Sequence, residues 1–220
     1  MGSYLNPGNL SFRGSLRSKI YVDKSELICR TNEVLFTEQK YICVSRPRRF
    51  GKSMAANMLS AYYDRNENTE ELFHNLAISK DKTYKENLNQ YDVIKLNMQE
   101  FLSMSDTIEE MLGMIRNYLI SDFQETFPDV RFRDKQNLIQ VMKDVFSYTK
   151  CPFVILIDEW DCLFREYKQD KEAQKKYLDF LRVWLKDKDY VALAYMTGIL
   201  PIKKYGTHSA LNMFDEFSMI

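Results

Sequence analysis

The chain has 220 residues, of which 45% are hydrophobic and 14% aromatic, and it contains only 7 glycines and 5 prolines. This length and composition are typical of one folded globular unit, and they exclude a disordered, collagen-like or linker-like chain. Lysine plus arginine and aspartate plus glutamate each number 31, so the formal net charge is zero. The whole-chain charge therefore provides no general attraction to nucleic acid or to an anionic membrane, and any basic site must be local.

Membrane association and secretion are also disfavoured. No apolar run approaches the roughly 20 residues that cross a bilayer, and the first residues lack the apolar segment of a signal peptide. We therefore expect a cytoplasmic protein without membrane contact. The cysteines form no CxxC pair, which favours buried free thiols over a metal or disulfide role. They are Cys29, Cys43, Cys151 and Cys162.

In chain order, residues 1–39 come first and are polar, with an Asn-Pro-Gly turn and one compact stretch at 20–28. We interpret them as an N-terminal extension packed on the domain formed by residues 40–220. Residues 64–90 are rich in Asn, Glu and Lys, which predicts a surface connection with one short helix at 70–76.

Four runs of β-branched and apolar residues predict buried strands at 41–44, 93–96, 153–157 and 191–196. Between them, apolar residues recur at three- and four-residue steps, which predicts helices around 55–63, 108–119, 138–146 and 173–185. Asp106 and Glu109 have the spacing of a capping box and predict a helix start there. This alternation predicts an α/β fold: a three-layer sandwich with a mostly parallel central sheet and helices on both faces.

The strongest local signal is SRPRRFGKS at residues 45–53, directly after the first strand and before a helix. In a phosphate loop, backbone N–H groups surround the phosphates, a lysine reaches their outer oxygens, and the next hydroxyl ligates Mg²⁺. Gly51, Lys52 and Ser53 occupy the last three positions of this pattern, but Arg46 replaces its first glycine. The alternative is a basic turn that caps a helix. The residues expected to contact nucleotide are Arg46, Pro47, Arg48, Arg49, Phe50, Gly51, Lys52, Ser53 and Met54.

The second signal is the apolar strand at 153–157, which ends in the adjacent carboxylates Asp158 and Glu159. Open α/β sheets bind ligands at the carboxyl ends of their strands, so Asp158 can hold Mg²⁺ there together with Ser53. Glu159 would polarise the attacking water. Alternatively, both carboxylates are solvated turn residues.

The third signal is Thr197 at the end of the last strand, whose hydroxyl could sense the γ-phosphate or orient water. The alternative is that Thr197 and Gly198 are only a small pair that turns the chain out of the sheet. The arginines of the loop could stabilise transferred charge, with Arg49 as an internal arginine finger. They could instead neutralise charge generally, pair with Asp158, Glu159 or Asp161, or contact the phosphates of DNA.

The motifs at 46–53, 157–161, 196–198 and 21–24 together resemble the bacterial AAA-ATPase-like family, and the resemblance covers nearly the whole chain. This resemblance implies a P-loop ATPase fold with an additional strand between the two Walker strands. It also implies that Lys52 and Ser53 bind ATP and Mg²⁺, that Asp158 binds the metal, that Glu159 binds the water, and that Thr197 is the sensor. Residues 21–24 would belong to the family's N-terminal segment.

Members of this family usually continue into further helices and a C-terminal region that resembles PD-(D/E)xK nucleases. We therefore expect residues 40–220 to be an ATPase domain truncated before those regions, with a protein partner or a nuclease-like domain as its effector. The function expected first is Mg²⁺-dependent ATP binding and hydrolysis. The alternatives are a nucleotide-sensing regulatory module with little hydrolysis, and a nucleic-acid-associated module.

Overall fold

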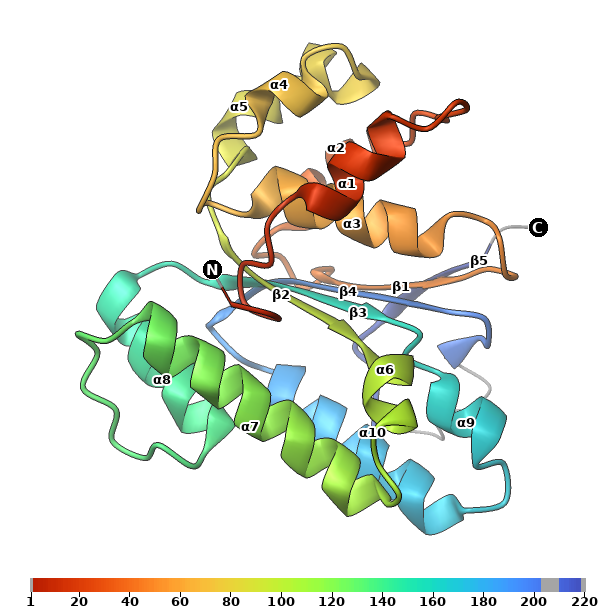
Figure 1. Ribbon diagram of the computed structural model, residues 1–220, viewed down its shortest axis with the longest axis vertical. Coiled ribbons are helices and arrows are strands. Elements are labelled where there is room, and N and C mark those ends of the chain that lie inside the picture. Colours follow the sequence, from red (N-terminus) through yellow and green to blue (C-terminus); the bar gives the residue numbers. More distant parts are fainter. Residues whose placement is uncertain (1, 203–209, 219–220) are drawn as a thin grey trace.

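The computed structural model describes residues 2–202 and 210–218. Within them, five parallel strands form one sheet in the spatial order β2-β3-β4-β1-β5. Helices cover both faces of the sheet, so the molecule has three layers (Figure 1). This confirms the predicted α/β fold. The strands are β1 Tyr41–Ser45, β2 Asp92–Asn97, β3 Phe153–Asp158, β4 Val191–Gly198 and β5 Asp215–Ser218.

One face of the sheet is covered by α3, with the N-terminal helices and the short helices of residues 70–87 packed around it (Figure 1). The opposite face is covered by α7, α8 and α10. The helices are α1 Leu10–Leu16, α2 Glu26–Val34, α3 Lys52–Tyr63, α4 Glu70–Phe73, the 3₁₀ helix η1 Ala77–Lys80, α5 Tyr84–Asn87, α6 Met98–Ser103, α7 Ile108–Thr126, α8 Leu138–Thr149, α9 Cys162–Glu166 and α10 Lys171–Leu185.

The strands are apolar on both faces because each face is buried under helices. In β1, Tyr41 and Cys43 belong to the core beneath α7, α8 and α10, whereas Ile42 and Val44 belong to the core beneath α3. Successive side chains of a strand point to opposite faces, so the apolar runs form two cores at once. The four predicted strands are confirmed. β4 lies between β1 and β3, as the family resemblance implied.

The fifth strand, β5, was not predicted. It pairs in parallel with β1 along the sheet edge, with Ile42 opposite Asp215 and Val44 opposite Phe217. Its sequence, DEFS, is short and polar and lacks the apolar run of a central strand. An edge strand has a strand neighbour on only one side, so it can be polar without exposing a core.

Two local predictions were wrong in detail. The helix expected to be capped by Asp106 begins one residue later, because Thr107 accepts from the backbone N–H of Glu110 and the Glu110 carboxylate accepts from Asp106. Residues 64–90 contain α4, η1 and α5 instead of one short helix. They are also not simply a surface connection, because Phe73, Ile78 and other apolar side chains of this segment are buried against α3.

The first residues of the chain lie along β2 at the other edge of the sheet. Leu5 forms an antiparallel bridge with Ile94, and Asn6 donates its backbone N–H to the carbonyl oxygen of Val93. The carboxylate of Asp122 accepts hydrogen bonds from the backbone N–H groups of Tyr4 and Leu5. These contacts cover the backbone groups of an otherwise open sheet edge.

All four cysteines are free thiols; Cys43, Cys151 and Cys162 are buried, as predicted, whereas Cys29 is only half-buried. None of the helices in the described residues is both long enough and apolar enough to cross a membrane.

Candidate functional site

The loop between β1 and α3, residues 46–51, contains two residues with a left-handed backbone, Arg49 with φ of 70° and Gly51 with φ of 75°. Glycine adopts this conformation without steric cost. Arginine adopts it only with steric strain, so the backbone strain of the loop is concentrated at Arg49. The backbone N–H groups of residues 48–54 donate to no acceptor in the described part of the chain. A row of unpaired N–H groups leading into a helix N-terminus is suited to bind an anion.

Lys52, the first residue of α3, lies under this loop and is only 7% exposed. Its ammonium donates to the carbonyl oxygens of Arg46 at 3.0 Å and Pro47 at 3.1 Å. These carbonyls are neutral, so the ammonium has no counter-charge among its hydrogen-bond partners. The lysine therefore retains the capacity to bind a stronger, anionic acceptor.

Asp158, at the carboxyl end of β3, joins three segments that are far apart in the sequence. Its Oδ2 accepts from the Ser53 hydroxyl at 2.5 Å, and its Oδ1 accepts from the Thr197 hydroxyl. Oδ1 also accepts from the backbone N–H of Glu159 at 3.0 Å. The structure thus brings together the predicted residues of the loop, of the second strand signal and of the last strand. Because the carboxylate is buried, its negative charge is stabilised mainly by these donors.

Glu159 follows Asp158 in a turn where its own backbone is left-handed, with φ of 54°. Its carboxylate forms an ion pair with the guanidinium of Arg165 on α9. The same guanidinium lies 3.4 Å from Asp161 and donates to the side-chain oxygen of Gln99 at 3.4 Å. Sequence reasoning missed Arg165, although its spacing of four residues from Asp161 in a helix start was a usable signal.

Asp161 is completely buried and holds the end of β4 in place. Its Oδ2 accepts from the backbone N–H groups of Ile199 at 3.0 Å and Leu200 at 2.8 Å. The turn after β3 and the turn after β4 are therefore fastened to each other, which positions Thr197 beside Asp158.

The arginine cluster does not pair with the carboxylates, so that alternative is wrong. Glu159 and Asp161 instead use Arg165 as their cation. Arg48 and Arg49 are exposed and Arg46 is half-buried, and these three form no ion pair within the described residues. The Nε atom of Arg46 is buried and has no hydrogen-bond partner there. Positive charge at the loop is therefore left uncompensated by the side chains that the structure describes, which suits an anion-binding site.

Two further lysines approach the site from elements that sequence reasoning did not connect with it. Lys24, from the segment before α2, donates to the carbonyl oxygen of Phe50 at 2.8 Å. Lys95 of β2 bonds to the side chain of Asn57 on α3. Burial lowers the pKa of Lys95, and the negative charge of Asp158 partly opposes this. Lys95 meets the site only through the fold. Lys24 belongs to the motif at 21–24, but that motif does not indicate the contact with the loop.

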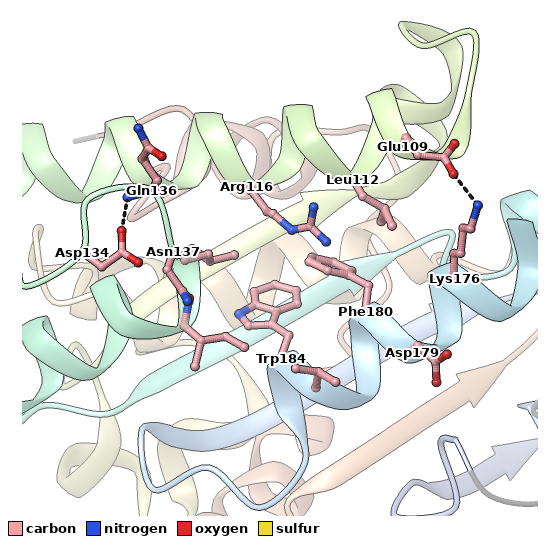
Figure 2. Close-up of a pocket in the computed structure, with 13 residues that line it drawn as sticks. Glu109, Leu112, Arg116, Asp134, Gln136, Asn137, Lys176, Asp179, Phe180 and Trp184 are labelled. Atoms are coloured by element: carbon pink, nitrogen blue, oxygen red, sulfur yellow. Dashed lines mark hydrogen bonds and ion pairs between the residues drawn. The ribbon is translucent and has the colours of Figure 1, made fainter.

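A well-defined cavity lies away from this site. It has a volume of about 800 Å³ and opens between α7, the residues that lead into α8, and α10 (Figure 2). There the guanidinium of Arg116 lies 5.2 Å from the centre of the Phe180 ring, and Lys176 pairs with Glu109 at 2.5 Å. None of the predicted nucleotide-site residues lines it, so it is separate from the phosphate loop.

Among the described residues, no cluster of three or more His, Cys, Asp or Glu side chains could hold a metal ion by itself. The donor set at Asp158 nevertheless fits Mg²⁺, which prefers one or two hard oxygen ligands from protein and takes its remaining ligands from water and phosphate. Ser53 and Asp158 supply such oxygens, and the adjacent N–H groups and Lys52 are suited to bind an anion such as phosphate.

The sequence model of a family described as "Predicted AAA-ATPase" matches residues 13–207. The chain belongs to this AAA-ATPase-like family. Membership of this family supports the interpretation of the chain as a nucleotide-binding P-loop domain. A solved structure, that of C. elegans PCH-2, aligns with this AAA-ATPase-like chain at 15% identity and a TM-score of 0.40. The alignment covers 95% of this chain and 46% of PCH-2, so the chain spans less than half the length of that protein. No curated protein matches the sequence.

Proposed function

We propose that this domain binds ATP with Mg²⁺ and hydrolyses the γ-phosphate. The observation that supports this best is the convergence of the Ser53 hydroxyl and the Thr197 hydroxyl on the buried carboxylate of Asp158, next to Lys52. A hydroxyl after the loop lysine and a carboxylate at the end of a neighbouring strand are the protein groups that hold the metal in P-loop ATPases.

The phosphates would be bound by residues 46–54. The unpaired N–H groups of residues 48–54 would surround them, and Lys52 would exchange the carbonyl oxygens of Arg46 and Pro47 for phosphate oxygens. A hydrogen bond between two charged groups is roughly twice as strong as one between neutral groups, so this exchange is favourable. Ser53 and Asp158 would hold Mg²⁺, which when bound neutralises charge on the phosphate oxygens.

Glu159 would polarise the attacking water, Thr197 would keep Asp158 in place and sense the γ-phosphate, and Arg49 would supply positive charge to the transferred group. The position of Arg49 supports this role, because its side chain is exposed at the loop and forms no ion pair within the described residues. Positioned charge of this kind contributes most where water is excluded.

One observation favours a second candidate function, that of a nucleotide-sensing module with little hydrolysis. Glu159 is paired with Arg165, which competes with water for its carboxylate. In that case binding of ATP would occur, but turnover would require a partner that breaks this ion pair.

The first experiment is the titration of a fluorescent ATP analogue, with Mg²⁺, against the wild type and Lys52→Ala. The expected result is micromolar binding by the wild type and affinity weakened by about 10- to 150-fold in the variant, which corresponds to about 1.5 to 3 kcal/mol for a charged hydrogen bond. Lys143→Ala is the matched control, because Lys143 is exposed on α8. Equal binding by the wild type and Lys52→Ala would contradict the proposed site.

Hydrolysis is tested separately with Glu159→Gln and phosphate release. If Glu159 polarises the water, the variant binds the analogue as the wild type does but loses turnover by about 100-fold or more. If the wild type binds nucleotide and releases no phosphate, the sensing module is the correct function.

A further inference from the structure

Lys24 places its ammonium on the backbone of the phosphate loop. Nζ donates to the carbonyl oxygen of Phe50 at 2.8 Å. A methyl group added to the next residue, Gly51, would lie 2.9 Å from the same nitrogen. The ammonium therefore occupies the space beside the Phe50–Gly51 peptide, immediately before the start of α3.

The segment around Lys24 is fixed by contacts on both sides of the lysine. The carboxylate of Asp23 accepts from the backbone N–H groups of Ser25 and Ala77, each at 2.8 Å. The hydroxyl of the buried Ser25 accepts from the backbone N–H of Ile78 at 3.1 Å. The backbone of Lys24 is thus fastened to η1, which fixes the point from which its side chain reaches the loop.

The charge of Lys24 is not used in an ion pair with any described residue. Its neighbour Asp23 is occupied by backbone N–H groups, and the lysine itself bonds to a neutral carbonyl. The ammonium of Lys24 therefore serves to bind the carbonyl oxygen of Phe50. It links the N-terminal segment directly to the loop that carries the unpaired N–H groups.

The hydrogen bond from Lys24 to the carbonyl oxygen of Phe50 also fixes the direction of the Gly51 N–H. In a planar trans peptide the C=O and the following N–H point in opposite directions. Because the carbonyl of Phe50 is directed at Lys24, the N–H of Gly51 is directed away from Lys24. That N–H has no acceptor within the described residues. An ammonium on the carbonyl side also polarises the peptide, which strengthens the N–H as a donor.

We infer that Lys24 is a positioning residue of the phosphate site: it fixes and polarises the Phe50–Gly51 peptide so that the N–H of Gly51 binds a phosphate oxygen of the nucleotide. This inference rests on the proposed function, because it assigns a role within the same site. It predicts that Lys24 affects affinity only for ligands that carry a polyphosphate.

The test compares Lys24→Met, which removes the ammonium but keeps a long apolar side chain, with Lys24→Arg, which restores a cation. Lys19→Met, at an exposed position of the same N-terminal segment, is the control. For each protein, the affinities for ATP, pyrophosphate and adenosine are measured by calorimetry with Mg²⁺, and thermal unfolding is followed without ligand.

The expected result is that Lys24→Met weakens the binding of ATP and pyrophosphate by about tenfold, as for loss of one charge-assisted contact. Its affinity for adenosine and its unfolding temperature without ligand should match the wild type, and Lys24→Arg should recover most of the loss. A purely structural role would instead lower the unfolding temperature and weaken all three ligands together, which would overturn the inference.

The outcomes separate this inference from the proposed function. If Lys52→Ala abolishes ATP binding while Lys24→Met binds as the wild type does, the phosphate site is correct and the role of Lys24 is wrong. If the wild type binds neither ATP nor pyrophosphate, both are wrong.

Discussion

The guanidinium of Arg165 and the carboxylate of Glu159 form an ion pair across the turn that joins β3 to α9. Both side chains are mostly buried, with 16% and 21% of their surfaces exposed, so water screens the pair only in part. Glu159, which is proposed to polarise water, is therefore held by a cation of the same chain. This arrangement favours slow turnover unless the pair opens.

We predict that Arg165→Met raises the rate of ATP hydrolysis by about three- to tenfold, because both oxygens of a carboxylate released from its cation can accept hydrogen bonds from water. The affinity for ATP should not change. The free energy of unfolding should fall by about 1 to 3 kcal/mol, since the buried carboxylate of Asp161 loses a nearby cation. Steady-state phosphate release and urea unfolding measure the two effects.

Arg182→Met is the control for that experiment, because Arg182 forms a more exposed ion pair with Asp179 on α10. It should change neither the rate nor the affinity. A loss of turnover in Arg165→Met, with ATP affinity preserved, would show that Arg165 assists Glu159 and does not restrain it.

The predictable part of the site was the part set by local sequence and by parallel-sheet geometry. The loop at 46–53 follows β1, Asp158 is the last residue of β3, and the carboxyl ends of parallel strands lie at one edge of the sheet. Thr197 lies at the end of a third strand, β4, so its convergence with Asp158 could be expected before the contacts were known. The apolar runs similarly indicated four of the five strands.

The remaining features depend on contacts between distant segments. Lys24 reaches the loop only because Asp23 and Ser25 bind the backbone of η1. β5 is recognised by its pairing with β1, which lies more than 170 residues earlier, and not by its polar sequence. The partner of Glu159 was wrongly sought among the loop arginines, because the left-handed backbone of Glu159 and the position of α9 are not visible in the sequence.

The hydroxyl of Thr197 is predicted to hold the carboxylate of Asp158 in place. Thr197→Val keeps the shape of the side chain but removes the buried hydrogen bond to a charged acceptor, so the free energy of unfolding should fall by about 1.5 to 3 kcal/mol. Mg²⁺-dependent binding of ATP should weaken as well. Thr197→Ser, which retains the hydroxyl, should recover both properties in urea unfolding and ATP titration. If Thr197→Val matches the wild type in both, Asp158 does not depend on this contact.

Acid sensitivity is predicted at Asp144 of α8, which fastens the preceding loop. Burial raises the pKa of its carboxyl, but hydrogen bonds from the backbone N–H and guanidinium of Arg133 and from Gln140 outweigh this and hold the pKa below the usual 3.8. A depressed pKa means that the folded state favours the carboxylate. The associated stabilisation is therefore present above pH 3.8 and is lost as the pH falls through the folded-state pKa.

Asp144→Asn should accordingly lower the free energy of unfolding at pH 7 by about 1 to 2 kcal/mol, the lower range for a charged hydrogen bond because Arg133 is largely exposed. The difference from the wild type should shrink as the pH falls below 3.8, in urea titrations at several pH values. Asp129→Asn, at an exposed position in the same loop, should show no such dependence. A difference that stays constant with pH would exclude the carboxylate as its source.

Gly198, the last residue of β4, has no room for a side chain. An added methyl group would lie 2.6 Å from Nε1 of Trp160 and 2.7 Å from Oδ1 of Asp161, and both of those residues are completely buried. Gly198→Ala should therefore lower the free energy of unfolding by about 1 to 3 kcal/mol through overpacking. It should also slow ATP turnover, because the displaced turn carries Glu159.

Gly113→Ala is the control. Nothing lies within 4 Å of the added methyl group in α7, so the free energy of unfolding should rise by about 0.5 to 1 kcal/mol. If the two substitutions change the free energy of unfolding in opposite directions, the site requires the close packing around Gly198 and not the flexibility of glycine. Urea unfolding measures both changes.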